Sequence, residues 1–190
     1  LEEIRKNYYD SLKSYINNHD SSKLYIDKMP LNIIHVAEIL RIFPNAKFII
    51  SIRHPCDCVL SCFMQDFHLN NAMSNFLNLD DSAKLYDSVM NLWFEYKSKF
   101  SFNYHEVRYE NLISNFETKV KSTLDFLELP WDNSLLEYHK TAKKRERIFT
   151  PSYDQVIKPI YSQASGRWVR YKEHISEIYP ILEPWIKKLH

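Results

Sequence analysis

Apolar side chains recur at helical spacing over several long segments of the chain. Residues 2–18 carry an apolar side chain every three or four positions, which predicts an amphipathic helix. The same spacing predicts helices over residues 31–43, 55–67, 80–100 and 111–129. Proline marks two boundaries, because Pro44 stops the helix over 31–43 and Pro55 suits the first turn of the next helix.

Shorter apolar runs predict strands between these helices. The run AKFIISI at 46–52 is almost continuously apolar, which predicts a parallel strand buried on both faces. KLYID at 23–27 and YHEVRY at 104–109 predict two further strands. Strands that alternate with helices through short connections indicate an α/β fold with a parallel sheet flanked by helices. No internal repeat or low-complexity linker interrupts the chain, so we expect one domain over 1–190.

Composition narrows the class of protein. The chain has 190 residues, of which 45% are hydrophobic and 15% aromatic, enough for one globular core. Its net charge of +1 gives no support for general binding to nucleic acid or a membrane surface. No apolar run approaches the roughly 20 residues that span a bilayer, and the N-terminus lacks a signal-peptide pattern. The charged opening LEEIRKNYYDSL without an initiator Met leads us to expect that the chain starts inside a longer protein.

The cysteines Cys56, Cys58 and Cys62 are clustered on the predicted helix that follows the central strand. An odd, clustered set is a poor disulfide framework, so we expect a reducing compartment and hence the cytoplasm. His54 and His68 lie nearby in the sequence, but C-x-C-x3-C lacks the paired spacing of zinc sites. We therefore expect packed helix thiols and no metal site.

A single glycine, Gly166, occurs in the whole chain. Phosphate-cradling loops use several glycines so that backbone N–H groups can approach the anion closely. Neither G-x-x-x-x-G-K-[ST] nor G-x-G-x-x-G is present, which excludes a complete nucleotide site of the P-loop type.

Charged residues follow each predicted strand, and ligands of open α/β sheets bind at the carboxyl ends of strands. The strand ends carry Asp27-Lys28, Arg53 and Arg108-Tyr109-Glu110. Any one of these charges can simply mark where a strand reaches solvent. The Arg53 guanidinium is nevertheless suited to bidentate phosphate recognition, and Ser61 and the N-terminal amides of the next helix could add donors. The pattern predicts an anion site at this strand-to-helix junction.

Five segments, in order over nearly the whole chain, resemble the sulfotransferase family. They are DKMPLN at 27–32, IFPNAKFIISIRHPCDCVLSCF at 42–63, VRYENL at 107–112, SYDQVIKPIY at 152–161 and GRWVRY at 166–171. The pattern R-x-P-x-D-x-x-x-S, formed by Arg53, Pro55, Asp57 and Ser61, is similar to the family's 3′-phosphate-binding signature. The likeness extends to bacterial enzymes that follow a tetratricopeptide region and to tyrosylprotein sulfotransferases. An upstream tetratricopeptide region is therefore one expectation for the full-length protein.

This resemblance implies a fold like that of P-loop NTPases and the donor 3′-phosphoadenosine 5′-phosphosulfate (PAPS), with adenosine 3′,5′-bisphosphate (3′,5′-ADP) as product. Arg53 and Ser61 would hold the 3′-phosphate of the donor, and Tyr109 would contact the nucleotide. Arg167 would close on the same phosphate, and Gly166, which precedes it in the GRW stretch, would belong to the same cofactor-binding set.

The resemblance also implies a second group of site residues. Lys28 would steady the transferring sulfuryl group and its leaving phosphate, assisted by Ser152. The segment 152–161, with Gln155, Lys158 and Tyr161, would line the far side of the nucleotide. Simpler readings stay open, since Lys28 could be a solvated strand end, Tyr109 part of the core, and Arg167 the partner of a carboxylate.

The chain departs from the family pattern upstream of Lys28. The family's first strand and 5′-phosphosulfate loop have no counterpart there, and Glu2 and Glu3 do not match the context of its acidic catalytic base. One hypothesis is an N-terminally truncated sulfotransferase domain that acts on a hydroxyl of a tyrosine, a sugar or a small molecule. The other is a catalytically inactive sulfotransferase-like module that binds nucleotide or another partner. A kinase relative is disfavoured by the missing Walker lysine. The tyrosylprotein likeness implies a secretory lumen as the alternative to the cytoplasm.

Overall fold

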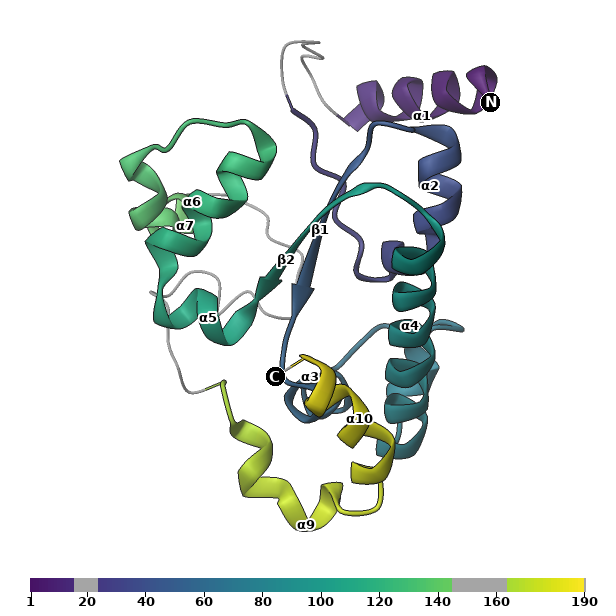
Figure 1. The fold of residues 1–190 in the computed structure, drawn as a ribbon, viewed down its shortest axis with the longest axis vertical. Coiled ribbons are helices and arrows are strands. Elements are labelled where there is room, and N and C mark those ends of the chain that lie inside the picture. The colour runs from purple at the N-terminus through teal and green to yellow at the C-terminus, as the bar shows by residue number, and fades with distance from the viewer. Residues whose placement is uncertain (16–23, 145–163, 190) are drawn as a thin grey trace. The chain divides into compact units, whose positions relative to one another are not determined.

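A computed structural model describes residues 1–15, 24–144 and 164–189 of the chain (Figure 1). The α-helices and strands, with 3₁₀ helices labelled η, follow one another in the order α1 (Glu2–Tyr15), η1 (Pro30–His35), α2 (Val36–Ile42), β1 (Lys47–Ile52), α3 (Pro55–Phe63), η2 (Met73–Phe76), α4 (Leu79–Lys99), β2 (Asn103–Arg108), α5 (Tyr109–Ser114), α6 (Phe116–Leu127), η3 (Asn133–Glu137), α7 (Tyr138–Lys144), η4 (Arg167–Tyr171), α9 (Lys172–Ile175) and α10 (Tyr179–Leu189).

The chain divides into two compact units. The first unit comprises Leu1–Phe48 and Val89–Tyr104, and the second comprises Ile49–Ser88 and His105–His190. The elements β1, α4 and β2 each begin in one unit and end in the other. A single domain over 1–190 stays a prediction.

The strands β1 and β2 are neighbours and run in the same direction (Figure 1). A helix follows each of them closely, because α3 begins at Pro55 and α5 begins at Tyr109. The predicted α/β class with parallel strands is therefore confirmed, as are the strands expected over 46–52 and 104–109.

The expectation that β1 is buried on both faces is wrong. Lys47, Ile49 and Ser51 are exposed, whereas Phe48 and Ile50 are half-buried and Ile52 is buried. Since successive side chains of a strand point to opposite faces, this alternation means that the described residues cover one face of β1. The β-branched residues of the run favour a strand, but they do not require both of its faces to be buried.

The prediction of a strand over 23–27 is also wrong for the described part of that segment. Residues 24–29 have no regular secondary structure, and Leu24, Ile26 and Met29 are 51%, 72% and 63% exposed. A strand needs a neighbour for its N–H and C=O groups, and in the described residues the sheet consists of β1 and β2.

The helices follow the predicted order with changes at their ends. The segment expected as one helix over 31–43 begins as η1 and continues as α2, a common arrangement at the start of an α-helix. The helix expected over 55–67 ends earlier, at Phe63. The long helix expected over 80–100 is α4.

The helix expected over 111–129 is divided into α5 and α6. Asn115, between them, has φ −140° and ψ 58°, which lies outside the helical region. Neither proline nor glycine marks this break, so the apolar spacing alone could not show it.

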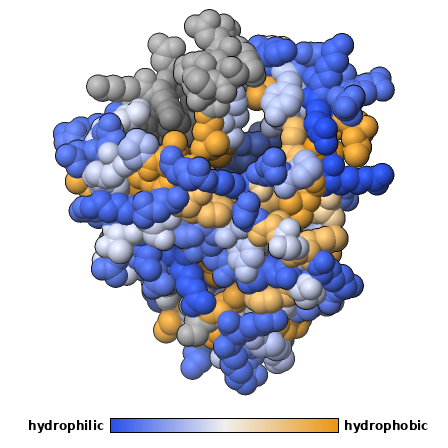
Figure 2. All heavy atoms as spheres, turned by 45° about the horizontal axis from the view of Figure 1, so that its top comes forward, coloured by the Kyte–Doolittle hydropathy of each residue, from blue (hydrophilic) through white to orange (hydrophobic). Residues whose placement is uncertain are grey.

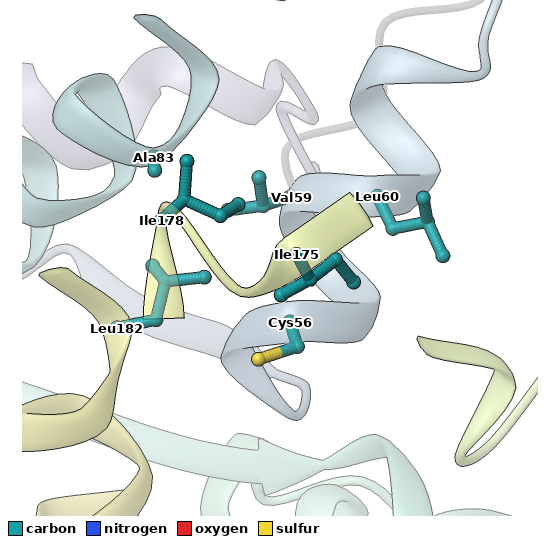
Figure 3. Close-up of a cluster of buried hydrophobic side chains, with 7 residues drawn as sticks. All are labelled: Cys56, Val59, Leu60, Ala83, Ile175, Ile178 and Leu182. Carbon is teal, nitrogen blue, oxygen red and sulfur yellow. The ribbon is translucent and has the colours of Figure 1, made fainter. Parts of the chain in front are cut away.

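An aliphatic cluster forms the core of the second unit (Figure 3). Its buried members are Cys56, Val59 and Leu60 from α3, Ala83 from α4, and Ile175, Ile178 and Leu182 from the C-terminal segment. The spacing of the α3 members places them on one helix face. The cluster thereby fixes α3, whose first turn carries the candidate site.

Aromatic rings pack around the buried Trp93 in the first unit. Trp93 is fully buried and meets Phe102 and Tyr104 edge-on, with ring centroids 5.7 and 5.4 Å away. Phe48 packs edge-on against Phe102 at 5.4 Å. Such edge-to-face pairs add stability beyond the apolar area that they bury.

Large apolar side chains also reach the surface. Figure 2 shows them interspersed among polar side chains on the face in view. The most exposed include Ile26, Leu69, Met29 and Leu77, all above 60%. Separately exposed apolar residues are normal on a folded protein. Within the described ranges, no helix combines the length and apolar character needed to cross a membrane.

Candidate functional site

The candidate site lies in the second unit, where β1 ends and α3 begins. Arg53 directly follows the buried Ile52, and Pro55 opens α3. Proline fits this position because its fixed φ is helical and the first helical N–H has no acceptor within the helix. His54, the N-cap residue, makes no capping hydrogen bond with its side chain. The first turn of α3 is therefore not capped by the side chain of its N-cap residue.

Arg53 is a half-buried cation with spare donors. Its guanidinium carbon lies over the Tyr109 ring, 5.2 Å from the centroid, and Nη2 donates a hydrogen bond to the carbonyl of Ala164. Its Nε is buried and has no hydrogen-bond partner among the described residues. A cation–π contact holds the guanidinium without using its N–H groups, so donors stay available for an anion.

Glu110 links the end of β2 to the end of β1 through a hydrogen bond. Its Oε1 accepts a hydrogen bond from the backbone N–H of His54 at 2.9 Å. Its Oε2 is buried and lacks a hydrogen-bond partner within the described part of the chain. Because Tyr109 and Glu110 open α5, the two neighbouring strand ends bring their helices together at Arg53.

Asp57 connects α3 to a turn far along the sequence. Its carboxylate accepts the N–H of Gly166 at 2.7 Å through Oδ2 and the N–H of Trp168 at 2.8 Å through Oδ1. The residue is 1% exposed. A buried carboxylate needs such donors, since burying it without partners is costly.

The turn itself requires glycine for its backbone conformation. Gly166 has φ 68° and ψ 15°, in the left-handed region that side chains with a Cβ adopt rarely. A Cβ at this position would meet nothing within 4 Å, so the requirement is conformational rather than steric.

A ring stack also joins the turn to the start of α3. The rings of His54 and Trp168 lie 5.1 Å apart and within 11° of parallel. Together with the bonds of Arg53 and Asp57, this stack holds the segment from Ala164 to Trp168 against the junction. The predicted GRW stretch thus lies beside the predicted anion site.

The predicted phosphate ligands Ser61 and Arg167 lie on neighbouring elements. Ser61 is half-buried on α3, and Arg167 is the half-buried first residue of η4. The contact between α3 and η4 is part of the second unit. Among the described residues, Arg167 pairs with no carboxylate, which was the simpler reading of this side chain.

The three thiols of α3 are free, as expected for packed helix thiols. Burial and the neighbouring Asp57 raise the pKa of Cys56 to about 11. Cys58 and Cys62, one helical turn apart, share a hydrogen bond that raises the pKa of Cys58 and lowers that of Cys62. The positive charge of Arg53 also acts to lower both pKa values.

The remaining predicted site residues lie elsewhere. Lys28 belongs to the first unit, is exposed, and makes no hydrogen bond or ion pair with another described residue. The predictions for Ser152, Gln155, Lys158 and Tyr161 fall outside the described residues.

Two acidic residues of the site had no role assigned from the sequence. Asp57 entered only as a member of the R-x-P-x-D-x-x-x-S pattern, and Glu110 only as a charge at a strand end. One signal was available for Asp57, since it is the one charge in the otherwise apolar or small α3 sequence PCDCVLSCF. A single carboxylate in the first turn of a buried helix favours donors from another segment.

The sulfotransferase family model matches residues 1–133. This chain belongs to the sulfotransferase family. An uncharacterized protein of Aquifex aeolicus (strain VF5) is 31% identical over 168 residues, which cover 86% of this chain and 21% of that protein. Protein-tyrosine sulfotransferase 1 of Danio rerio is 23% identical over 162 residues, which cover 83% of this chain and 45% of the relative.

A solved structure supports the fold of this member of the sulfotransferase family. The sulfotransferase domain from the curacin biosynthetic pathway superimposes with a TM-score of 0.62 at 18% identity, covering 93% of this chain and 67% of that chain. The predicted family and α/β fold class are therefore confirmed. The chain spans less than half the length of the two relatives named above.

Proposed function

We propose that this chain is the PAPS-dependent catalytic domain of a sulfotransferase that transfers a sulfuryl group to a hydroxyl. The observation that carries the proposal is the set of contacts around the Arg53 guanidinium. Its half-buried guanidinium is braced by Tyr109, and its buried Nε has no partner among the described residues. A braced arginine with a spare donor, at the carboxyl end of a parallel strand, is suited to a phosphate.

The residues present fit the 3′-phosphate of the donor. Arg53 would supply the fork of N–H donors, Ser61 a hydroxyl, and Arg167 a second cation. The N-terminal turn of α3 favours negative charge through its dipole. Tyr109 would orient Arg53 and lie against the nucleotide. When bound, PAPS supplies a sulfuryl group that is activated by its bond to a phosphate.

A second group of residues is proposed for the transfer step, in which negative charge must be neutralised. Lys28 would neutralise negative charge on the leaving phosphate, with Ser152 beside it. Gln155, Lys158 and Tyr161 would line the nucleotide site. Transfer of this kind depends mainly on positioning and on neutralising charge at spectator and leaving oxygens, which cations and amides can supply.

We propose a hydroxyl acceptor, and tyrosine is the first to test. Relatives from Danio rerio and Drosophila melanogaster carry the name protein-tyrosine sulfotransferase. Sugar and small-molecule hydroxyls are the other acceptor classes of the proposal. The free thiols on α3 support a reducing compartment such as the cytoplasm over a secretory lumen.

Calorimetric titration of the full chain with 3′,5′-ADP tests the donor site. We expect Arg53→Ala to weaken binding by about 10- to 100-fold, because a charge-assisted hydrogen bond to phosphate contributes about 1.5–3 kcal/mol. Arg170→Ala is the matched control, since Arg170 is an exposed arginine of the same unit. Its affinity should stay within about twofold of the original chain.

The outcomes separate the two hypotheses. Binding together with transfer of sulfuryl groups from PAPS to a tyrosine peptide would support the enzyme. Binding without turnover on tyrosine, sugar or small-molecule hydroxyls would assign the chain to the inactive nucleotide-binding class. A folded chain that binds no 3′,5′-ADP would overturn the proposed donor site.

A further inference from the structure

The two oxygens of Asp57 bracket Arg167. One oxygen accepts the N–H of Gly166, the residue before Arg167, and the other accepts the N–H of Trp168, the residue after it. The bonds are 2.7 and 2.8 Å long, and they join segments 109 and 111 residues apart in sequence. The backbone on both sides of Arg167 is therefore fixed by one side chain of α3.

Asp57 acts as the N-cap acceptor that η4 lacks. Gly166 is the N-cap residue of η4, and having no side chain it cannot cap the helix itself. An N-cap side chain ordinarily accepts the N–H of the second or third helical residue. The Asp57 carboxylate accepts the N–H of Trp168, the second residue of η4, and so performs this function from another helix.

The charge of Asp57 is directed at the backbone rather than at a cation. Its carboxylate is 1% exposed and forms no ion pair with a basic side chain among the described residues. A carboxylate offers two acceptors to two N–H donors, whereas an amide of the same shape offers one acceptor and an opposing donor. The turn thus uses both acceptor oxygens of aspartate, one of which asparagine would replace with a donor.

We infer that Asp57 is a positioning residue of the proposed 3′-phosphate site, holding the Gly166–Trp168 backbone so that Arg167 and Arg53 serve the same anion. This inference rests on the proposed function. Arg53 and Asp57 lie on one turn around the start of α3, and both bond to the segment that carries Arg167. A shift of that backbone would separate the two cations without removing either.

The turn has further supports, so loss of Asp57 need not unfold it. The His54–Trp168 ring stack and the hydrogen bond from Arg53 to the Ala164 carbonyl do not involve the Asp57 side chain, so we expect both to persist in an Asp57→Asn variant. The variant replaces one acceptor with an N–H₂ group that opposes an N–H donor of the turn. We expect a displaced turn on an intact core.

The readout is the preference for a 3′-phosphate. It is the ratio of the affinity for 3′,5′-ADP to the affinity for adenosine 5′-monophosphate, measured by calorimetry on the full chain. We expect Asp57→Asn to lower this ratio about tenfold, with the affinity for the monophosphate changed by less than about twofold. Arg167→Ala should lower the ratio similarly, and the double variant should lose no more than Arg167→Ala alone.

Asp87→Ala provides the matched control. The Asp87 carboxylate accepts the Trp185 indole N–H at 2.8 Å within the same unit. Its loss should lower the melting temperature and leave the ratio unchanged. A purely structural Asp57 would behave like Asp87, with a lower melting temperature and an unchanged ratio, and that result would overturn the inference.

A second variant decides the case if Asp57→Asn does not fold. Gly166→Ala keeps Asp57 but disfavours the left-handed turn, and the space around its Cβ is open. It should lower the ratio as Asp57→Asn would, and an unchanged ratio would overturn the inference. If the original chain itself shows no preference for 3′,5′-ADP, the proposed function fails, and the inference fails with it.

Discussion

Two cations predicted for the same reaction have very different surroundings. Arg53 is half-buried, lies over Tyr109, and donates to the Ala164 carbonyl. Lys28 is exposed in a segment without regular structure, and no described residue forms a hydrogen bond or ion pair with it. The proposed phosphate site is thus organised by the protein itself, whereas the described contacts do not restrain the proposed catalytic lysine.

The comparison suggests a division of work. An organised arginine loses little conformational freedom on binding, so it contributes to affinity for the nucleotide. An unrestrained lysine contributes where charge develops during transfer, and its ordering is then part of the reaction. Binding and turnover should therefore respond to different substitutions.

The largest expected effect is that of Lys28→Ala on turnover. If Lys28 neutralises the leaving phosphate, kcat should fall by about 100- to 1,000-fold, the loss typical of removing one group that stabilises developing charge. Affinity for 3′,5′-ADP should change by less than about threefold. Steady-state kinetics with PAPS and a tyrosine peptide, beside calorimetry, measure both.

Lys47→Ala is the control for that substitution, because Lys47 is an exposed lysine of the same unit. It should leave kcat unchanged. A Lys28→Ala variant that loses affinity and keeps kcat would reverse the division of work between the two cations.

A smaller effect is expected from Tyr109→Leu. Loss of the ring removes the cation–π contact that braces Arg53, a contribution of about 0.5–1 kcal/mol, so 3′,5′-ADP should bind about two- to fivefold more weakly. Tyr109→Phe keeps the ring and should bind nearly as well as the original chain. Equal losses in both variants would mean that the hydroxyl, rather than the ring, matters.

The smallest effect concerns the reactivity of Cys62. Its hydrogen bond with Cys58 and the charge of Arg53 lower the pKa of Cys62, whereas burial raises the pKa of Cys56 to about 11. Near pH 8 the thiolate fraction is therefore larger at Cys62, and iodoacetamide should modify it before Cys56. Mass spectrometry of partly modified protein identifies the order.

Bound 3′,5′-ADP should slow that modification of Cys62 by about twofold or more. An anion at Arg53 offsets the positive charge, so it should raise the pKa of Cys62 toward its ordinary value. The rate at Cys56 serves as the internal control. An unchanged rate at Cys62 with saturating nucleotide would place the anion away from Arg53.

Much of the fold follows from apolar spacing. The runs over 46–52 and 104–109 form β1 and β2, and parallel strand ends place Arg53 and Tyr109 together. The strand predicted over 23–27 does not form in its described part. The prediction failed because an apolar run cannot show whether a neighbouring strand is present to pair with it. The break at Asn115 depends on a local conformation that helical spacing does not record.

The candidate site was only partly accessible from the sequence. The family pattern placed Arg53, Ser61 and Arg167 in one site, and α3 meets η4 in the second unit. The bonds from Asp57 could not be predicted, since they join backbone donors 109 and 111 residues away. Pairings at such sequence separations depend on the tertiary fold rather than on local preference.

The separation between Asp57 and its donors also determines when the site can form during synthesis. Trp168 leaves the ribosome 111 residues after Asp57, which at about 5–20 residues per second is a delay of about 6 to 22 seconds. Until both Gly166 and Trp168 have emerged, the carboxylate lacks its full set of native amide donors. Nucleotide that recognises the completed turn therefore cannot assist the early, cotranslational stages of folding, and can stabilise the protein only after the C-terminal segment has arrived.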